Sequence, residues 1–119
     1  MSYDLEIALP YPPSVNHYWR HTRAGGHYIS DKGRKYRDQV FLTCLGHLPF
    51  KKPVAISVDV YFPDNRQRDL DNLGKVLLDS LVHAQIIEDD CWQFVPELHW
   101  KACGVKKGGQ VVVSFKMLS

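Results

Sequence analysis

The stretch Val54–Phe62, VAISVDVYF, limits the possible folds of this chain most strongly, because large apolar side chains occupy every second position along it. A period of two predicts a β-strand with one buried face. That face carries Val54, Ile56, Val58, Val60 and Phe62. A strand of this kind needs a covering layer, so the chain must supply helices or a second sheet to pack on it.

Two segments have the periodicity of covering helices. The first follows Ser30, a favourable N-cap residue. Its apolar positions recur at helical spacing and are Tyr36, Val40, Phe41, Cys44, Leu45 and Leu48. The second follows the polar loop Pro63–Arg68 and is expected to end near Gln85. Its predicted buried side carries Leu70, Leu73, Leu77 and Leu81.

Three further segments are typical of strands. Near the N-terminus, Leu5, Ile7 and Leu9 alternate with other residues. The segment 91–102 contains Pro96, which favours an edge strand or a bulge because proline lacks a ladder donor. The run VVVSFKML at 111–118 closes the series. In a chain of 119 residues, this order predicts one α+β domain over residues 1–119, a mixed sheet with two helices packed on one face.

Charge is unevenly distributed, although the net charge of the chain is only +2. Residues 13–38 carry six Lys or Arg against two Asp, in an aromatic stretch interrupted by Gly25-Gly26. Such a stretch suits a hairpin-like arm. Residues 59–90 carry eight acids against three bases. A basic arm and an acidic patch are therefore expected on one small domain.

Three cysteines without a CxxC pair indicate reduced thiols rather than a disulfide framework. His99 and Cys103 lack a second pair at ligand spacing, so a strand and a turn position explain them better than a zinc site. The N-terminal segment has neither a basic nor an apolar signal region, and no apolar run reaches the length needed to cross a bilayer. These features predict a cytoplasmic protein without a membrane partner.

The segment Asn65–Leu81, NRQRDLDNLGKVLLDSL, concentrates carboxylates beside basic residues. A purely structural role is one explanation of them. Asp69 would be the N-cap of the second helix, and Asp71 would lie in its first turn, where the helix dipole favours negative charge. The pair Asp89-Asp90 would then be a polar turn.

A functional explanation treats the same carboxylates as a metal site. Asp71, Lys75 and Asp79 recur four residues apart and would form a polar stripe opposite the leucines. If Asp90 packs back toward the start of this helix, several carboxylates converge, and they repel one another unless a cation lies between them. Hard oxygen ligands that leave water molecules in place suit Mg²⁺, for which Mn²⁺ can substitute.

The motif RDLDNLGKVLLDSL followed by EDD resembles the RusA-like family of Holliday-junction resolvases, as do LPYPPSVNHYWR and KGRKYRD earlier in the chain. The resemblance covers nearly the whole sequence. It implies a homodimeric, divalent-metal endodeoxyribonuclease that cuts four-way DNA junctions in symmetric pairs during recombination and repair. It also implies metal ligands at Asp69, Asp71 and Asp90, Lys75 as their catalytic cationic partner, and Asn72 as the family's Asn after the second Asp.

Affinity for DNA would have to come from basic side chains, since an acidic pocket repels phosphate. The candidates are Arg20, Arg23, Lys32, Arg34, Lys35 and Arg37, with Arg66 and Arg68 flanking the acids. Tyr18 and Tyr28 are candidates for stacking on unpaired bases, whereas Trp19 is expected in the core. A two-fold-symmetric junction matches a C₂ dimer. The alternative from another class is a non-catalytic, structure-selective DNA-binding module whose acids hold a structural metal.

Overall fold

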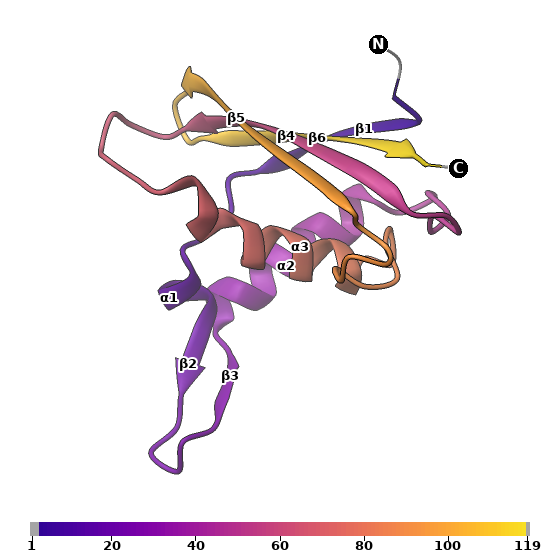
Figure 1. Cartoon of the computed structure of the whole chain (residues 1–119). Coiled ribbons are helices and arrows are strands. Elements are labelled where there is room, and N and C mark those ends of the chain that lie inside the picture. The colour runs from indigo at the N-terminus through magenta and orange to yellow at the C-terminus, as the bar shows by residue number, and fades with distance from the viewer. Residues whose placement is uncertain (1–2, 119) are drawn as a thin grey trace.

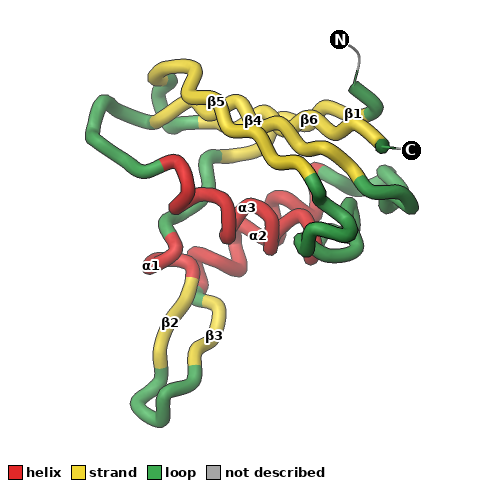
Figure 2. Tube along the Cα trace, in the orientation of Figure 1, coloured by secondary structure: helices red, strands yellow, loops and turns green. Residues whose placement is uncertain are grey.

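A sheet covered on one face by helices forms the body of the molecule, and a narrow hairpin projects from it (Figures 1 and 2). The computed structural model describes residues 3–118, apart from the side chains of His21 and His27. Its elements are β1 (Leu5–Pro10), α1 (Val15–Tyr18), β2 (Trp19–His21), β3 (His27–Ile29), α2 (Asp31–Thr43), β4 (Val54–Phe62), the 3₁₀ helix η1 (Leu70–Leu73), α3 (Gly74–His83), β5 (Glu97–Val105) and β6 (Gln110–Met117).

The main sheet is mixed, as predicted. Its strand order is β1-β6-β4-β5. The pairs β1·β6 and β4·β6 are antiparallel, and β4·β5 is parallel. The two long helices, α2 and α3, lie on the same face of this sheet (Figure 1). The short helices α1 and η1 were not predicted.

The core lies between that face and the helices. Along β4 the exposed fractions of Val54, Ile56, Val58 and Val60 are 1% or less, which confirms the buried face expected from the alternation. On the helix side, the predicted leucines Leu73, Leu77 and Leu81 are buried, whereas Leu70 is only partly buried. Phe62, at the end of β4, is also only partly buried. The period of two on the strand and the leucine spacing on the helix therefore meet in one apolar layer.

The first predicted helix begins where expected but ends early. Ser30 caps α2, and its hydroxyl oxygen accepts a hydrogen bond of 3.0 Å from the amide of Gly33. The helix ends at Thr43, because Gly46 adopts a left-handed conformation (φ 89°) that breaks the helix, as glycine commonly does at this position. The expectation that Leu45 and Leu48 belong to this helix is therefore wrong, and both side chains lie beyond its end with exposed fractions of 58% and 86%.

The second predicted helix begins with the 3₁₀ turn η1 and not with a capped α-helix. Asp69 precedes that turn in an extended conformation, and its side chain makes no capping hydrogen bond. Asp69 thus occupies the N-cap position that the structural explanation gives it, but the capping hydrogen bond of that explanation is not formed. At the other end, α3 stops at His83 and Gln85 takes a positive φ of 62°, close to the predicted end.

Strand β5 lies at the edge of the sheet, as Pro96 suggested. It starts only after that proline, however, because residues 91–95 form a turn in which the amides of Phe94 and Val95 donate to the carbonyl of Cys91. The irregularity in its pairing lies near the other end, where Ala102 and Gly104 oppose Val60 and Tyr61 and Cys103 is the extra residue.

The predicted arm is the hairpin β2–β3, which extends away from the sheet below α1 (Figure 1). Its base is held at the start of α2. The amide of Ser30 donates to the carbonyl of Tyr18 at 2.9 Å, and Gly33 lies so close that a Cβ there would be 2.6 Å from the same carbonyl oxygen. The arm is thus anchored through a backbone contact that only glycine permits.

Two predictions about sequence class can be compared with the structure. All three cysteines are free, with Cys44 buried and Cys91 and Cys103 partly exposed. Within residues 3–118, no helix has both the length and the apolar character needed to span a lipid bilayer.

The substitution Gly33→Ala tests the anchoring of the arm. Alanine has the higher helix propensity, yet its Cβ would meet the Tyr18 carbonyl oxygen at 2.6 Å and the Ile29 side chain at 2.8 Å. We expect the free energy of unfolding to fall by about 1–3 kcal/mol, as for other overpacked sites. Chemical denaturation measures it, with exposed Asp38→Ala in the same helix as the control. Unchanged or higher stability of Gly33→Ala would contradict this contact.

Candidate functional site

The candidate site lies where β4 ends. Because β4 and β5 are parallel, their C-terminal ends share one edge of the sheet, and the loop Pro63–Arg68 leaves β4 there and leads into Asp69 and η1. In open sheets with parallel strands, ligands bind beyond these C-terminal ends. The predicted acidic motif therefore occupies the position at which this topology commonly forms a site.

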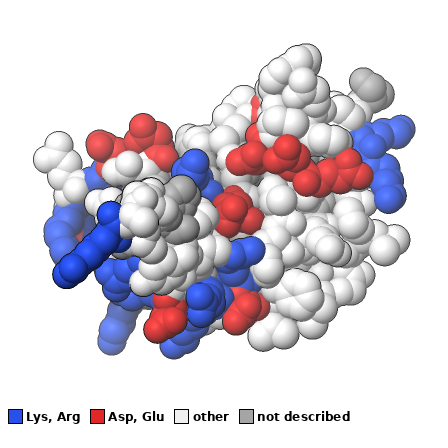
Figure 3. Space-filling view, turned by 90° about the horizontal axis from the view of Figure 1, so that it is seen from below, with Lys and Arg blue, Asp and Glu red and all other residues white. Residues whose placement is uncertain are grey.

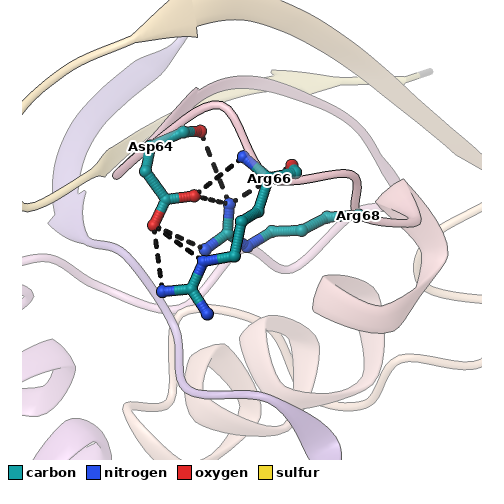
Figure 4. A network of polar contacts seen from close by, with 3 residues as sticks. All are labelled: Asp64, Arg66 and Arg68. Atoms are coloured by element: carbon teal, nitrogen blue, oxygen red, sulfur yellow. Dashed lines mark hydrogen bonds and ion pairs between the residues drawn. The ribbon is translucent and has the colours of Figure 1, made fainter.

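Asp64 organises this loop (Figure 4). Its carboxylate accepts two hydrogen bonds from Arg68, at 2.6 Å from Nη1 and 3.1 Å from Nη2. It also accepts the backbone amide of Arg66 at 2.9 Å, and the Arg66 guanidinium lies 3.2 Å away. Arg66 and Arg68, two and four residues after Asp64, thus both fold back onto its carboxylate. These contacts hold the chain in place just before Asp69.

The same contacts set the ionisation of Asp64. Hydrogen bonds from the Arg68 side chain, and then from the Arg66 amide, hold the pKa of the Asp64 carboxyl well below its usual range. In return, the hydrogen bond to Asp64 raises the pKa of Arg68. Arg68 was predicted to bind nucleic acid. The structure gives its guanidinium a bidentate partner within the chain, so its first role is to hold this loop.

A cleft of about 960 Å³ runs between this loop and the start of α2. Its charged lining residues are Lys32, Lys35, Arg66, Arg68 and Asp69. The remaining wall of the cleft includes Tyr11–Ser14, His17 and Asn72. Arg66 and Arg68 are paired with Asp64, so Lys32 and Lys35 carry most of the positive charge with which this cleft attracts a polyanion, beside one acidic group, Asp69.

The two aspartates of the motif are exposed at the rim of this region. Asp69 lines the cleft, and Asp71 follows it in the first turn of η1. Within residues 3–118 neither carboxylate has an ion pair or a side-chain hydrogen bond, and Lys75 on α3 also has no ion-pair partner. Oxygen ligands without a protein partner are available to a hard cation. Lys75 is available to a phosphate, because the structural alternative of an i, i+4 pair with Asp71 or Asp79 is not formed.

Asp90 follows the C-terminal end of α3 and is separated by that helix from Asp69 and Asp71. The segment that carries it leaves the C-terminal end of α3 and leads into β5, whereas Asp69 and Asp71 lie before its N-terminal end (Figure 1). A helix of ten residues is about 15 Å long. In the described part of one chain, no group of three or more His, Cys, Asp or Glu side chains is placed to hold a metal ion. The expectation that Asp90 packs back toward the start of the helix is therefore not met within a single chain.

Several residues predicted at the surface serve the packing of the helices. Tyr18 is fully buried and its hydroxyl donates to the carboxylate of Asp79, so stacking of Tyr18 on a base is excluded. Burial and this hydrogen bond raise the pKa of Tyr18. Arg37 lies against the same carboxylate, with Nε buried 4.0 Å from Asp79 Oδ2, and its guanidinium contacts His83. Arg37 thus joins α2 to α3 and is poorly placed to contact DNA.

The remaining basic candidates are exposed. Lys and Arg side chains gather mainly on one half of the helix side of the molecule, with acidic side chains among and beside them (Figure 3). Arg20 and Arg23 lie on the hairpin, as does Tyr28, whose exposed fraction of 51% leaves its ring free to stack on a base. Arg34 in α2 is exposed and lies 3.9 Å from Asp31.

Asp64 and His17 belong to the site but were not predicted from the sequence. Asp64 was part of a loop described only as polar, although an acid two and four residues before arginines is a pattern that can form such a clamp. His17 lies in the sequence of the basic arm, and its place in the cleft depends on the packing of α1 against α2, which has no local signal.

Comparison with known proteins gives a consistent match. The family model "Endodeoxyribonuclease RusA" matches residues 10–114. The chain is 48% identical over 90 residues to the crossover junction endodeoxyribonuclease of Enterobacteria phage HK97, covering 73% of this chain and 74% of that protein. It is 40% identical to the enzyme of the same name from Enterobacteria phage 82 and 38% identical to that of Escherichia coli strain K12, each over 108 residues and 88% of both chains.

The Asp64 clamp can be tested by titration. We expect Arg68→Met to raise the pKa of Asp64 toward the ordinary value of 3.8, and Arg66→Met to raise it less, because Arg66 retains its backbone hydrogen bond. Carbon-detected NMR of the Asp64 carboxyl group as a function of pH measures both.

The effect of these two substitutions on the stability of the protein depends on pH. A depressed pKa in the folded state means that the clamp stabilises the protein above the unfolded pKa of Asp64 and that this contribution is lost as the pH falls. The two substitutions should therefore reduce stability at neutral pH and change it less in acid. An equal response of Asp64 to both substitutions would show that Arg68 has no special role.

Proposed function

Because this chain belongs to the RusA family of endodeoxyribonucleases, we propose that it resolves four-way DNA junctions by paired, symmetric cleavage of the phosphodiester backbone, with Mg²⁺ and as a homodimer. The observation that carries the proposal is the basic cleft beside Asp69 and Asp71. It combines the positive charge that a DNA backbone requires with free carboxylates that a divalent cation requires.

The donor set fits Mg²⁺. Asp69 and Asp71 are exposed carboxylates close in sequence at the start of η1, and their oxygens are not engaged by other described side chains. Mg²⁺ retains several of its waters and needs only one or two carboxylates in addition to substrate phosphate. Mn²⁺ prefers similar oxygen ligands and is expected to substitute.

Each group then has a separate task. When bound, Mg²⁺ supplies Lewis acidity toward water and toward the scissile phosphate. Lys32 and Lys35 bind the DNA backbone and set its position in the cleft, while the Asp64 clamp holds the loop that presents Asp69. Lys75, one helical turn after Asp71, offers a positive charge where negative charge develops on the reacting phosphate.

The position of Asp90 gives the dimer a specific role. If Asp90 is a third ligand, the length of α3 prevents it from joining Asp69 and Asp71 of its own chain, so it has to join those of the second subunit. A two-fold dimer would then contain two composite sites, which matches the two symmetric cuts that a four-way junction requires. This arrangement retains the predicted ligand set of Asp69, Asp71 and Asp90.

The alternative is a structure-selective DNA-binding module in which the carboxylates hold a structural metal. The exposure of Asp69 and Asp71 argues against it, since ligands of a structural ion are commonly enclosed and joined to the core. Cleavage of a synthetic four-way junction with and without Mg²⁺ separates the two functions: the alternative predicts binding without any cutting.

A mixed-subunit experiment tests the composite site. We expect Asp71→Asn and Asp90→Asn each to reduce junction cleavage by on the order of 100- to 1,000-fold in a homodimer. A heterodimer of the two variants, prepared with two different affinity tags, retains one intact site made from Asp69 and Asp71 of one chain and Asp90 of the other. This heterodimer should bind Mn²⁺ at one site per dimer and cut one strand of the junction.

The outcomes are distinct. A wild-type heterodimer carrying the same two tags is the control and should cut both strands. If the ligands came from one chain, the mixed dimer would be as inactive as its parents and would show no recovery of Mn²⁺ binding. If homodimeric Asp90→Asn cut normally, Asp90 would not be a ligand at all.

The role of the cleft lysines can be separated from catalysis. We expect Lys32→Gln combined with Lys35→Gln to weaken junction binding and to reduce the slope of log K against log salt by about 1.8, or 0.9 for each lost phosphate contact. The matched control is Lys51→Gln with Lys52→Gln, which removes the same charge from exposed positions outside the cleft. Fluorescence anisotropy at several salt concentrations measures both, and equal slopes would exclude a special role for the cleft.

A further inference from the structure

The hairpin arm has an inner and an outer face. Trp19 lies opposite Ile29 in the antiparallel pair β2·β3, and both side chains are partly buried against the core. The Trp19 ring packs edge-on to the ring of buried Tyr18, with 5.2 Å between the ring centres. The next pair along the arm is Arg20 and Tyr28, and we call these two residues the outer pair. Because side chains alternate between the two faces of a strand, the outer pair points away from the core, and both of its residues are exposed.

The outer pair has the chemistry of a nucleic-acid contact. Among the side chains that the structure describes, neither Arg20 nor Tyr28 has a hydrogen bond or an ion pair with another residue. Residues opposite each other in an antiparallel pair have Cβ atoms about 5 Å apart, so the guanidinium and the ring can act on one ligand. An exposed aromatic ring stacks on the face of a base, and a guanidinium binds phosphate. Residues 19–30 contain two Arg and no Asp or Glu, which suits a polyanion such as DNA.

Hydrogen bonds at both ends of the arm fix the position of the outer pair. At the base, the amide and the hydroxyl of Ser30 both donate to the carbonyl of Tyr18, at 2.9 and 3.1 Å. At the tip, the amide of Thr22 donates to the carbonyl of Gly26 at 2.7 Å, and the Gly26 amide donates to Thr22 Oγ1 at 3.0 Å. Gly25 completes this turn with a φ of 89°, which glycine adopts without strain. A contact surface that is ordered in advance loses less conformational entropy when it binds.

The arm begins and ends beside the basic cleft. It leaves the body just after His17 and returns just before Lys32, and both of these residues line the cleft. DNA bound in the cleft therefore runs past the base of the arm, which projects beyond the body of the molecule (Figure 1). Bases in a linear duplex are covered by neighbours on both faces, whereas bases at a point of strand exchange have a face that a side chain can cover. The position of the outer pair thus suits the branch point of a junction.

We propose that the outer pair recognises the branch point of a four-way junction: the Tyr28 ring stacks on a base at the point of strand exchange, and the Arg20 guanidinium binds a neighbouring phosphate. The outer pair then provides the preference for branched over linear DNA. The cleft lysines, Lys32 and Lys35, bind the backbone of either DNA, since phosphate contacts position a protein without reading the form of its ligand. This inference rests on the proposed function, because it takes the four-way junction as the substrate.

Binding measured in EDTA, where no cutting occurs, tests the outer pair. Tyr28→Leu removes the ring and should weaken binding to a synthetic four-way junction by about 5- to 150-fold, the range for a base stacked on an aromatic side chain. Its affinity for a linear duplex should change by less than about twofold, because no base face is open there. Tyr28→Phe keeps the ring and should keep the preference for the junction. Arg20→Gln should reduce the slope of log K against log salt by about 0.9 on the junction and by less on the duplex. The matched control is Tyr3→Leu, which removes an exposed tyrosine beside the N-terminus, away from the arm (Figure 1), and should change neither affinity.

Photo-crosslinking of the wild-type protein locates the contact even if Tyr28→Leu fails to fold, which circular dichroism would reveal. A junction with 5-iodouracil at the branch point should cross-link to the peptide that contains Tyr28, identified by mass spectrometry, whereas the same label within one of the duplex arms should not. If Tyr28→Leu or Arg20→Gln affects both DNAs equally or neither, or if the branch-point label cross-links elsewhere, the inference is wrong. Junction-selective binding that depends on Tyr28 without any cleavage in Mg²⁺ would contradict the proposed function and leave this inference intact.

Discussion

The parallel pairing of β4 with β5, with α3 packed beneath them, is the constraint on which the rest of this structure depends. A parallel connection has to return the chain to the same end of the sheet, and α3 does so while burying Leu73, Leu77 and Leu81. This crossover also determines where two acidic segments lie. The loop after β4 opens at one end of α3, and the segment with Asp90 lies at the other, so the two acidic segments are kept apart within one chain.

Charge near this loop is divided between holding and binding. Asp64 uses its carboxylate within the chain, where Arg66 and Arg68 keep it ionised and keep the loop in one conformation. Asp69 and Asp71, only a few residues later, have no such partners among the described residues. The contrast is physically sensible, because a carboxylate already satisfied by bidentate arginine has little affinity left for a cation. The same short segment therefore contains one acid that is used within the fold and two that are free to bind a cation.

A similar division applies to the basic arm. Arg37 and Tyr18, which the sequence places among DNA-binding candidates, converge on Asp79 between the helices and hold α1, α2 and α3 together. Lys32 and Lys35 on the preceding turn remain free and line the cleft. One face of α2 thus supports the fold and the other lines the cleft, and the two faces meet within a single helical turn.

Local patterns were sufficient for the elements and for the acidic motif. Alternation in Val54–Phe62, leucine spacing after Asp69, the cap at Ser30 and the proline before β5 each reflect a short-range steric or burial rule, and each led to the right element. The ends and partners of these elements depended on long-range packing. Leu45 and Leu48 follow the helical period but are exposed because Gly46 ends the helix. Asp64 finds its arginines, and Asp90 is separated from Asp71, only because the chain crosses over between β4 and β5, since spacing along a sequence does not specify which distant segments share one end of a sheet.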